Sequence, residues 1–129
     1  MHDLRGLKAW QRAYTLSLDI YRATKTFPVD ERFGLTSQLR RAAVSIGANI
    51  AEGCGHRSDR EVGRFMQLSL ASASELEHEL LLARDLGLLD SDGATDLIER
   101  TIEVRRMLTP IVARLQRHPP RPLVSRESR

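Results

Sequence analysis

Glu75 and His78 have the spacing in this sequence that most suggests metal chemistry. A Glu-x-x-His motif places a carboxylate and an imidazole on one helical face, as di-iron bundles require. Such a site needs a second Glu-x-x-His motif on another helix, and His2, His56 and His118 have no Glu three residues before them. We therefore expect no metal site and assign the pair to a solvated or interface surface.

Cys54 and His56 supply a thiol and an imidazole, the residue types of a nucleophile and its base. They lie two residues apart in a glycine turn, with no third group to orient them. The segment Gly53-Cys54-Gly55 also lacks the preceding strand and the following Gly-Lys-Ser/Thr of a phosphate-binding loop. No enzyme signature remains, so we predict a non-enzymatic protein without catalytic residues or cofactors.

Basic side chains are better candidates for function, because several of them cluster at helical spacing. Arginines near a helix start can bind phosphate oxygens and give sequence-independent, salt-sensitive affinity for RNA or DNA. The candidate contacts are Lys8, Arg12, Arg40, Arg41, Arg57, Arg60 and Arg64. Under the alternative, these residues are merely solvated or form ordinary ion pairs. The carboxylates expected to pair with Arg40 or Arg41 are then Glu75, Glu77 and Glu79.

Apolar residues recur at three- and four-residue steps in four segments, which predicts four amphipathic helices. The expected ranges are about 5–25, 36–53, 58–86 and 92–116. In the first helix, the main apolar row is Leu7, Trp10, Tyr14, Leu18 and Tyr21, widened by Ala13, Leu16 and Ile20. The sequence therefore predicts an all-α, antiparallel up-down four-helix bundle over residues 1–116. We expect residues 117–129, a basic Pro- and Arg-rich tail, to be disordered.

Local signals mark the expected helix ends. They are Thr36 or Ser37 as the cap of the second helix, Gly53 to Gly55 as its left-handed end, Ser58 with Glu61 as a capping box, and Gly87 as the residue that ends the third helix.

The second helix has three distinct faces. One is an apolar row, and another is a row of tiny residues, Ala43, Gly47 and Ala51, which allows another backbone to approach closely. The third is polar but hardly charged, unlike an ordinary solvated face, and we expect it to be a subunit interface. Its residues are Gln38, Arg41, Ser45, Asn49 and Glu52.

Composition fits a single soluble domain, with 41% hydrophobic and 29% charged residues among 129. No apolar run is long enough to span a bilayer, and the N-terminus lacks a signal peptide, so we expect a cytoplasmic protein without a membrane partner. Charge is segregated: Lys and Arg against Asp and Glu number 11 to 7 in residues 1–64, 5 to 9 in 65–116 and 4 to 1 in 117–129. This distribution favours electrostatic pairing within or between subunits.

Three segments together resemble the four-helix-bundle family named after proteins encoded in intervening sequences of 23S ribosomal RNA genes. They are Leu7 to Gln11, Phe33 to Ile46, and Asn49 to Gly53, and Ser72 to Leu80 resembles the family's Ser-x-x-Glu-Leu-Glu segment. The resemblance implies a ring-shaped homopentamer with no assigned catalytic role. The family is similar to the accessory variability proteins of diversity-generating retroelements, which bind nucleic acid and a reverse transcriptase.

These observations predict a homo-oligomeric module that binds structured RNA or DNA through basic surface residues. The alternative is a protein-interaction adaptor, for example an accessory subunit of a reverse transcriptase, whose charges serve mainly to pair subunits.

Overall fold

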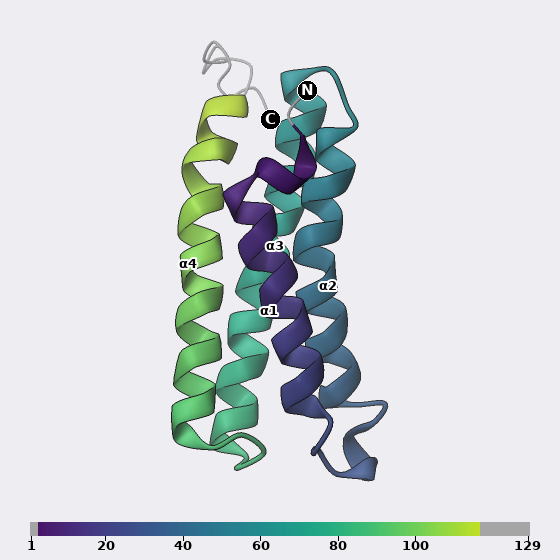
Figure 1. Ribbon diagram of the computed structural model, residues 1–129, viewed down its shortest axis with the longest axis vertical. Coiled ribbons are helices and arrows are strands. Elements are labelled where there is room, and N and C mark those ends of the chain that lie inside the picture. Colours follow the sequence, from purple (N-terminus) through teal and green to yellow (C-terminus); the bar gives the residue numbers. More distant parts are fainter. Residues whose placement is uncertain (1–2, 117–129) are drawn as a thin grey trace, which may run out of the picture.

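Four antiparallel helices form the molecule, in the up-down-up-down order of a four-helix bundle (Figure 1). The computed structural model describes residues 3–116. Its helices are α1 (Lys8–Thr24), α2 (Leu35–Cys54), α3 (Asp59–Asp85) and α4 (Ser91–Leu115), with 3-10 turns η1 (Leu4–Gly6) and η2 (Val29–Glu31). The all-helical bundle is confirmed, and the largest difference from the expected helix ends is the start of α1 at residue 8. The tail predicted at 117–129 lies outside the described residues.

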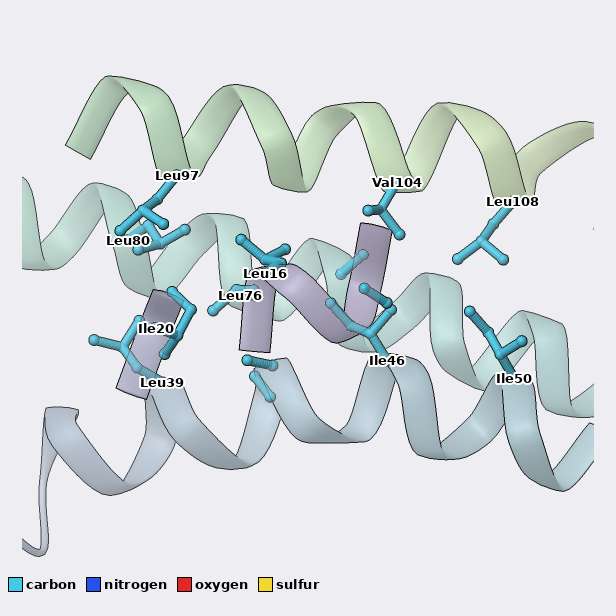
Figure 2. Close-up of a cluster of buried hydrophobic side chains, with 14 of the residues drawn as sticks. Leu16, Ile20, Leu39, Ile46, Ile50, Leu76, Leu80, Leu97, Val104 and Leu108 are labelled. Atoms are coloured by element: carbon cyan, nitrogen blue, oxygen red, sulfur yellow. The ribbon is translucent and has the colours of Figure 1, made fainter. Parts of the chain in front are cut away.

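The core runs along the bundle axis and takes side chains from all four helices (Figure 2). Its fully buried large residues include Leu16, Ile20, Leu39, Ile46, Ile50, Leu76, Leu80, Val104 and Leu108. Within each helix they recur at three- and four-residue steps, because that spacing keeps side chains on one side of the helix. Each such burial stabilises the fold by roughly 1.5–3 kcal/mol.

The apolar face expected on α1 was predicted correctly only for the residues that widen it, Ala13, Leu16 and Ile20. Tyr14, Leu18 and Tyr21 are 54%, 41% and 43% exposed, whereas Ala13 and Leu16 are completely buried. Both rows satisfy the three-four spacing, so the periodicity alone could not separate them. The row with the small residue faces inward, because a small side chain lets two helices pack closely. The aromatic row consequently lies on the outer surface.

The row of tiny residues on α2 faces α1 of the same chain. Ala43 is fully buried, and the hydroxyl of Ser17 on α1 donates to its carbonyl oxygen at 3.0 Å. A Cβ at Gly47 would lie 3.8 Å from the Trp10 ring and 3.9 Å from the Ala13 Cβ. The close backbone approach predicted from sequence is therefore the packing of α2 against α1.

One end of the bundle, here the closed end, holds both the α1–α2 and the α3–α4 connections, residues 25–34 and 86–90 (Figure 1). The expected cap of α2 was wrong: the helix begins at Leu35, and the Glu31 carboxylate accepts a hydrogen bond from the Leu35 N–H at 3.0 Å. The Thr36 hydroxyl is buried inside the helix, without a hydrogen-bond partner among the described residues. A side chain from the preceding turn therefore replaces the expected hydroxyl cap.

The end of α3 was predicted correctly. Gly87 has φ +76°, the left-handed conformation that L side chains rarely adopt. Its N–H donates to the Arg84 carbonyl at 3.0 Å, and the Leu88 N–H donates to the Ala83 carbonyl at 2.9 Å. These two bonds form a Schellman motif. The Asp90 side chain then caps α4 by accepting from the Gly93 N–H.

The opposite end, here the open end, holds the first turn of α1, the α2–α3 connection and the last turn of α4 (Figure 1). The Ser58 hydroxyl accepts from the Glu61 N–H at 3.2 Å, which confirms this half of the capping box. The expected left-handed end of α2 is wrong, since Gly55 has φ −81° and continues in a right-handed turn. That compact turn leads the chain directly into the cap of α3.

Candidate functional site

The seven predicted cations separate into two groups along the bundle axis. Lys8, Arg57, Arg60 and Arg64 lie in the first turns of α1 and α3 or just before α3, at the open end. Arg12, Arg40 and Arg41 lie further along the bundle. The up-down topology explains the first group, because the start of α1 and the start of α3 must lie at the same end.

Three cations of the open-end group are available to an external anion. Lys8, Arg57 and Arg60 are exposed, and none forms an ion pair within residues 3–116. Arg64 is less free, since its guanidinium lies 3.3 Å from the Glu61 carboxylate and 4.4 Å from the centre of the Phe65 ring.

Arg114, in the last turn of α4, belongs to the same group and was missed from sequence. It is exposed, and with Lys8 and Arg57 it lines one hollow at the open end. The signal was present, because in an up-down bundle the end of the fourth helix lies beside the start of the first. The basic surface at the open end therefore consists of Lys8, Arg57, Arg60 and Arg114.

Arg12 and Arg40 are engaged within the chain. Arg12 lies 2.6 Å from the Glu103 carboxylate of α4. The Arg40 Nε donates to the Thr24 hydroxyl at 2.8 Å, and its guanidinium lies 4.5 Å from the centre of the Tyr21 ring. Arg40 thus ties α2 to the end of α1.

Arg41 is exposed and lies close enough to Glu79 of α3 for its charge to act on that carboxylate, without an ion pair in the described part of the chain. Glu79 is only 6% exposed, and its Oε1 has no hydrogen-bond partner among residues 3–116. Burial, together with the negative charge of Glu75, raises the pKa of Glu79 to about 7, although Arg41 opposes the shift. Under the alternative, Arg40 or Arg41 pairs with one of three carboxylates of α3, but one of these, Glu77, lies 2.6 Å from Arg105 of α4.

The polar stripe on α2 is partly used inside the chain. The hydroxyls of Ser45 on α2 and Ser72 on α3 lie 2.8 Å apart. The Asn49 amide donates to the Ser45 carbonyl at 2.9 Å and to its hydroxyl at 3.0 Å. Ser45 and Asn49 are half-buried, whereas Gln38, Arg41 and Glu52 at the two ends of the stripe are exposed. The stripe therefore joins α2 to α3, and its role between subunits stays a prediction.

The residues first considered for chemistry are not arranged as a site. Glu75 and His78 are both exposed on α3. The His56 ring stacks on Phe65 with the ring centres 5.0 Å apart. Cys54 is half-buried in the wall of the open-end hollow, where burial raises the pKa of its thiol. A raised pKa disfavours the nucleophilic thiolate at neutral pH.

No group of three or more His, Cys, Asp and Glu side chains within residues 3–116 is placed to hold a metal ion. Over the same residues, none of the helices combines the length and apolar character needed to cross a membrane.

Comparison with known proteins agrees with this architecture. A family model described as "23S rRNA-intervening sequence protein" matches residues 5–110. The fold is similar to a crystal structure from Bacteroides thetaiotaomicron VPI-5482, described as a protein of unknown function from the S23 ribosomal protein family. The TM-score is 0.73 at 20% identity, over 81% of this chain and 97% of that one. A search of curated proteins gave no match.

Proposed function

Since this chain belongs to the family of 23S rRNA-intervening sequence proteins, we propose that it is a non-enzymatic homo-oligomeric module that binds RNA or DNA through its open end. The observation that carries the proposal is the basic surface of Lys8, Arg57, Arg60 and Arg114, whose cations form no ion pair within residues 3–116. Unpaired cations bind phosphates without first breaking an internal pair, and they release counterions from the nucleic acid.

The homo-oligomeric part of the proposal rests on the outer face of α1 and α2. Tyr14, Leu18 and Tyr21 on α1, Val44 on α2 and Phe33 just before α2 are all more than 40% exposed. Exposed apolar residues gathered on one face favour a protein partner. A ring of subunits, with a pentamer favoured by the family resemblance, would cover this face and collect the open ends of all subunits on one side of the ring.

The test of nucleic-acid binding is a fluorescence-anisotropy titration of a labelled RNA hairpin and a labelled DNA duplex at two salt concentrations. We compare the wild type with the double variant Arg57→Gln/Arg60→Gln. The matched control, Lys25→Gln/Arg32→Gln, removes the same charge from exposed residues of the closed end. The open-end variant should bind at least tenfold more weakly at low salt, and its log-log salt slope should fall by about 2, roughly 0.9 for each phosphate that is no longer neutralised.

Equal losses of affinity in the two double variants would show a diffuse charge effect and contradict an interface at the open end. If the protein binds neither the RNA hairpin nor the DNA duplex at low salt, the nucleic-acid function is overturned.

The exposed apolar face of α1 and α2 also favours a second function, a protein-interaction adaptor that docks a reverse transcriptase or another enzyme. Multi-angle light scattering separates the two uses of that face. If the purified protein is an oligomer and Leu18→Glu converts it to a monomer, the face is used for self-association. The control substitution for Leu18→Glu is Leu86→Glu, just after α3, which should leave the oligomer intact. A wild-type monomer, in which Tyr14, Leu18 and Tyr21 stay exposed, would favour the adaptor instead.

A further inference from the structure

A cavity of about 860 Å³ opens at the open end and reaches between all four helices. Its walls include Ile50, Val62, Met66, Met107, Ile111 and Leu115. This volume lies within the range of about 300–1,000 Å³ that is typical of small-molecule sites. Val62, Met107, Ile111 and Leu115 are partly exposed, whereas Ile50 and Met66 are only 1% and 4% exposed.

The cavity has a cause in the lengths of the helices. The 17 residues of α1 compare with 27 in α3 and 25 in α4, so α1 is shorter by 8 to 10 residues. At 1.5 Å per residue this is a deficit of about 12–15 Å. At the closed end, the buried Phe27 ring fills part of the gap beyond α1. At the open end α1 begins short of the ends of its neighbours, and only the 3-10 turn η1 precedes it (Figure 1).

Close contacts between the other helices prevent them from collapsing into this space. A Cβ at Gly63 of α3 would lie 3.2 Å from the Leu115 Cβ of α4. A Cβ at Gly53 of α2 would lie 3.2 Å from the Phe65 Cβ of α3. The pairs α3–α4 and α2–α3 are therefore already at contact distance, and their packing holds the cavity open beside α1.

Charge is unevenly distributed around the cavity. Lys8, Arg57 and Arg114 line it, and Asp59 is the single carboxylate among the described lining residues. The three cations form no ion pair within residues 3–116. Apolar walls with a cationic lining suit a molecule that has an apolar chain and one anionic head. A neutral hydrocarbon would leave the cations unused, and a polyanion could not enter the apolar interior without a large desolvation cost.

We propose that this cavity binds a fatty-acid-like amphipathic anion. The hydrocarbon chain lies among the partly exposed Val62, Met107 and Ile111, and the carboxylate lies at Lys8, Arg57 and Arg114. Charge-assisted hydrogen bonds to guanidinium groups fix the head, while burial of the chain supplies most of the affinity. This site does not depend on nucleic-acid binding, although the two share Lys8, Arg57 and Arg114.

Cys54 provides the readout, because it lines the cavity and is the single cysteine of the chain. The full-length protein is treated with a maleimide, and the rate of Cys54 modification is followed by mass spectrometry. The probes are decanoate and laurate below their micellar concentrations, decanol as the neutral analogue, decyltrimethylammonium as the cationic analogue and acetate as the head group alone. Calorimetry with decanoate gives the affinity.

Decanoate and laurate should slow the modification of Cys54 in a saturable way, and the other three probes should protect it far less at equal concentration. Arg57→Gln/Arg114→Gln should weaken decanoate binding roughly tenfold or more, the scale expected when a charge-assisted hydrogen bond is removed. The control Arg22→Gln/Arg84→Gln, on arginines remote from the cavity, should leave the affinity unchanged.

A second variant, Ile111→Trp, fills the cavity and should abolish protection by decanoate. Its melting temperature, compared with that of the wild type, verifies that it is folded. The proposal is overturned if decanoate does not change the rate of Cys54 modification, or if decanol protects equally. Since the RNA titration uses a different readout, failure of thiol protection leaves the nucleic-acid proposal intact, and the reverse also holds.

Discussion

The two ends of the bundle differ in what surrounds their charged residues. At the closed end, charges are used internally: Glu31 caps α2, Arg40 binds Thr24 and Tyr21, and Asp90 caps α4. At the open end, Lys8, Arg57 and Arg114 line an apolar hollow and form no ion pair within the described residues.

An arginine network just above the closed end shows the same internal use of charge. Arg100 of α4 lies 2.9 Å from Asp19 of α1, which also receives Arg22 at 2.8 Å. Burial alone would raise the pKa of Asp19, but the hydrogen bonds and charges of Arg22 and Arg100 outweigh it and lower the pKa. Arginines thus occur both in internal networks and at the open end, so residue type alone does not identify a binding surface in this protein. What distinguishes the open end is that three cations unpaired within residues 3–116, Lys8, Arg57 and Arg114, line one apolar cavity.

The largest expected difference between the two ends is in the free energy of unfolding that is lost when a buried leucine is replaced by alanine. Leu39, in the closed half, and Leu108, beside the open-end cavity, are both 0% exposed. Leu39→Ala should lower the free energy of unfolding by about 4 kcal/mol, and Leu108→Ala by about 2–3 kcal/mol. Leu108 loses less because it already borders a hollow and has fewer partner atoms.

Urea denaturation followed by circular dichroism measures both values. Equal losses of stability would mean that the cavity is packed in solution and that the two ends do not differ in this respect.

Glu79 lies in the closed half but differs from the charged residues described there. It is a buried carboxylate whose pKa is raised from 4.5 to about 7. The folded state therefore binds this proton more tightly than the unfolded state. Its contribution to stability is fully present below pH 4.5 and is lost as the pH rises to about 7. The total loss is at most about 3.5 kcal/mol, from roughly 1.4 kcal/mol for each pKa unit between 4.5 and about 7.

Glu79→Gln should be more stable than the wild type at pH 8 and should lack this decline. Thermal unfolding between pH 4.5 and 8 checks the prediction. Glu99→Gln removes an exposed carboxylate of α4 and should keep the wild-type profile, and an unchanged profile in Glu79→Gln would assign the titration to another group.

Between the two ends, Gly47 controls how closely α1 and α2 pack. Gly47→Leu should destabilise the protein by about 1–3 kcal/mol or more, because its extra atoms would overlap Trp10 and Ala13. Gly47→Ala should instead be neutral or stabilise by up to about 1 kcal/mol, since its Cβ fits at 3.8 Å and Ala favours the helix. Melting temperatures of the two variants provide the comparison, and equal effects would show that the contact is not tight.

The smallest expected effect concerns the Schellman turn of the closed end. Gly87→Ala places a Cβ at φ +76° and should cost about 1–2 kcal/mol. Gly6→Ala, at the open end, should change stability little, because no atom outside the local chain lies within 4 Å of its Cβ. Thermal denaturation under identical conditions distinguishes the two, and a loss in Gly6→Ala as large as in Gly87→Ala would contradict the assigned roles.

Most of the architecture could be predicted from local patterns. The spacing of apolar residues on α2, α3 and α4 indicates which residues are buried, and Ser58, Gly87 and Asp90 mark helix ends through the hydrogen bonds that their side chains or backbones make. The failures were also local. Two adjoining rows on α1 had the same period, and Thr36 or Ser37 was expected as the cap of α2, whereas Glu31 from the preceding turn supplies it.

The sequence alone determined the four helices, their antiparallel order and the family, because these follow from periodicity, capping and a long ordered motif. Only the tertiary structure decided which charges are free. Arg40 and Arg57 are chemically identical, but one binds Thr24 and Tyr21 while the other lines a cavity. Pairing depends on residues distant in the chain that packing brings within a few ångströms, and helix lengths determine where packing leaves a hollow. The candidate function therefore lies at the end of the bundle where three cations, unpaired within the described residues, line one cavity.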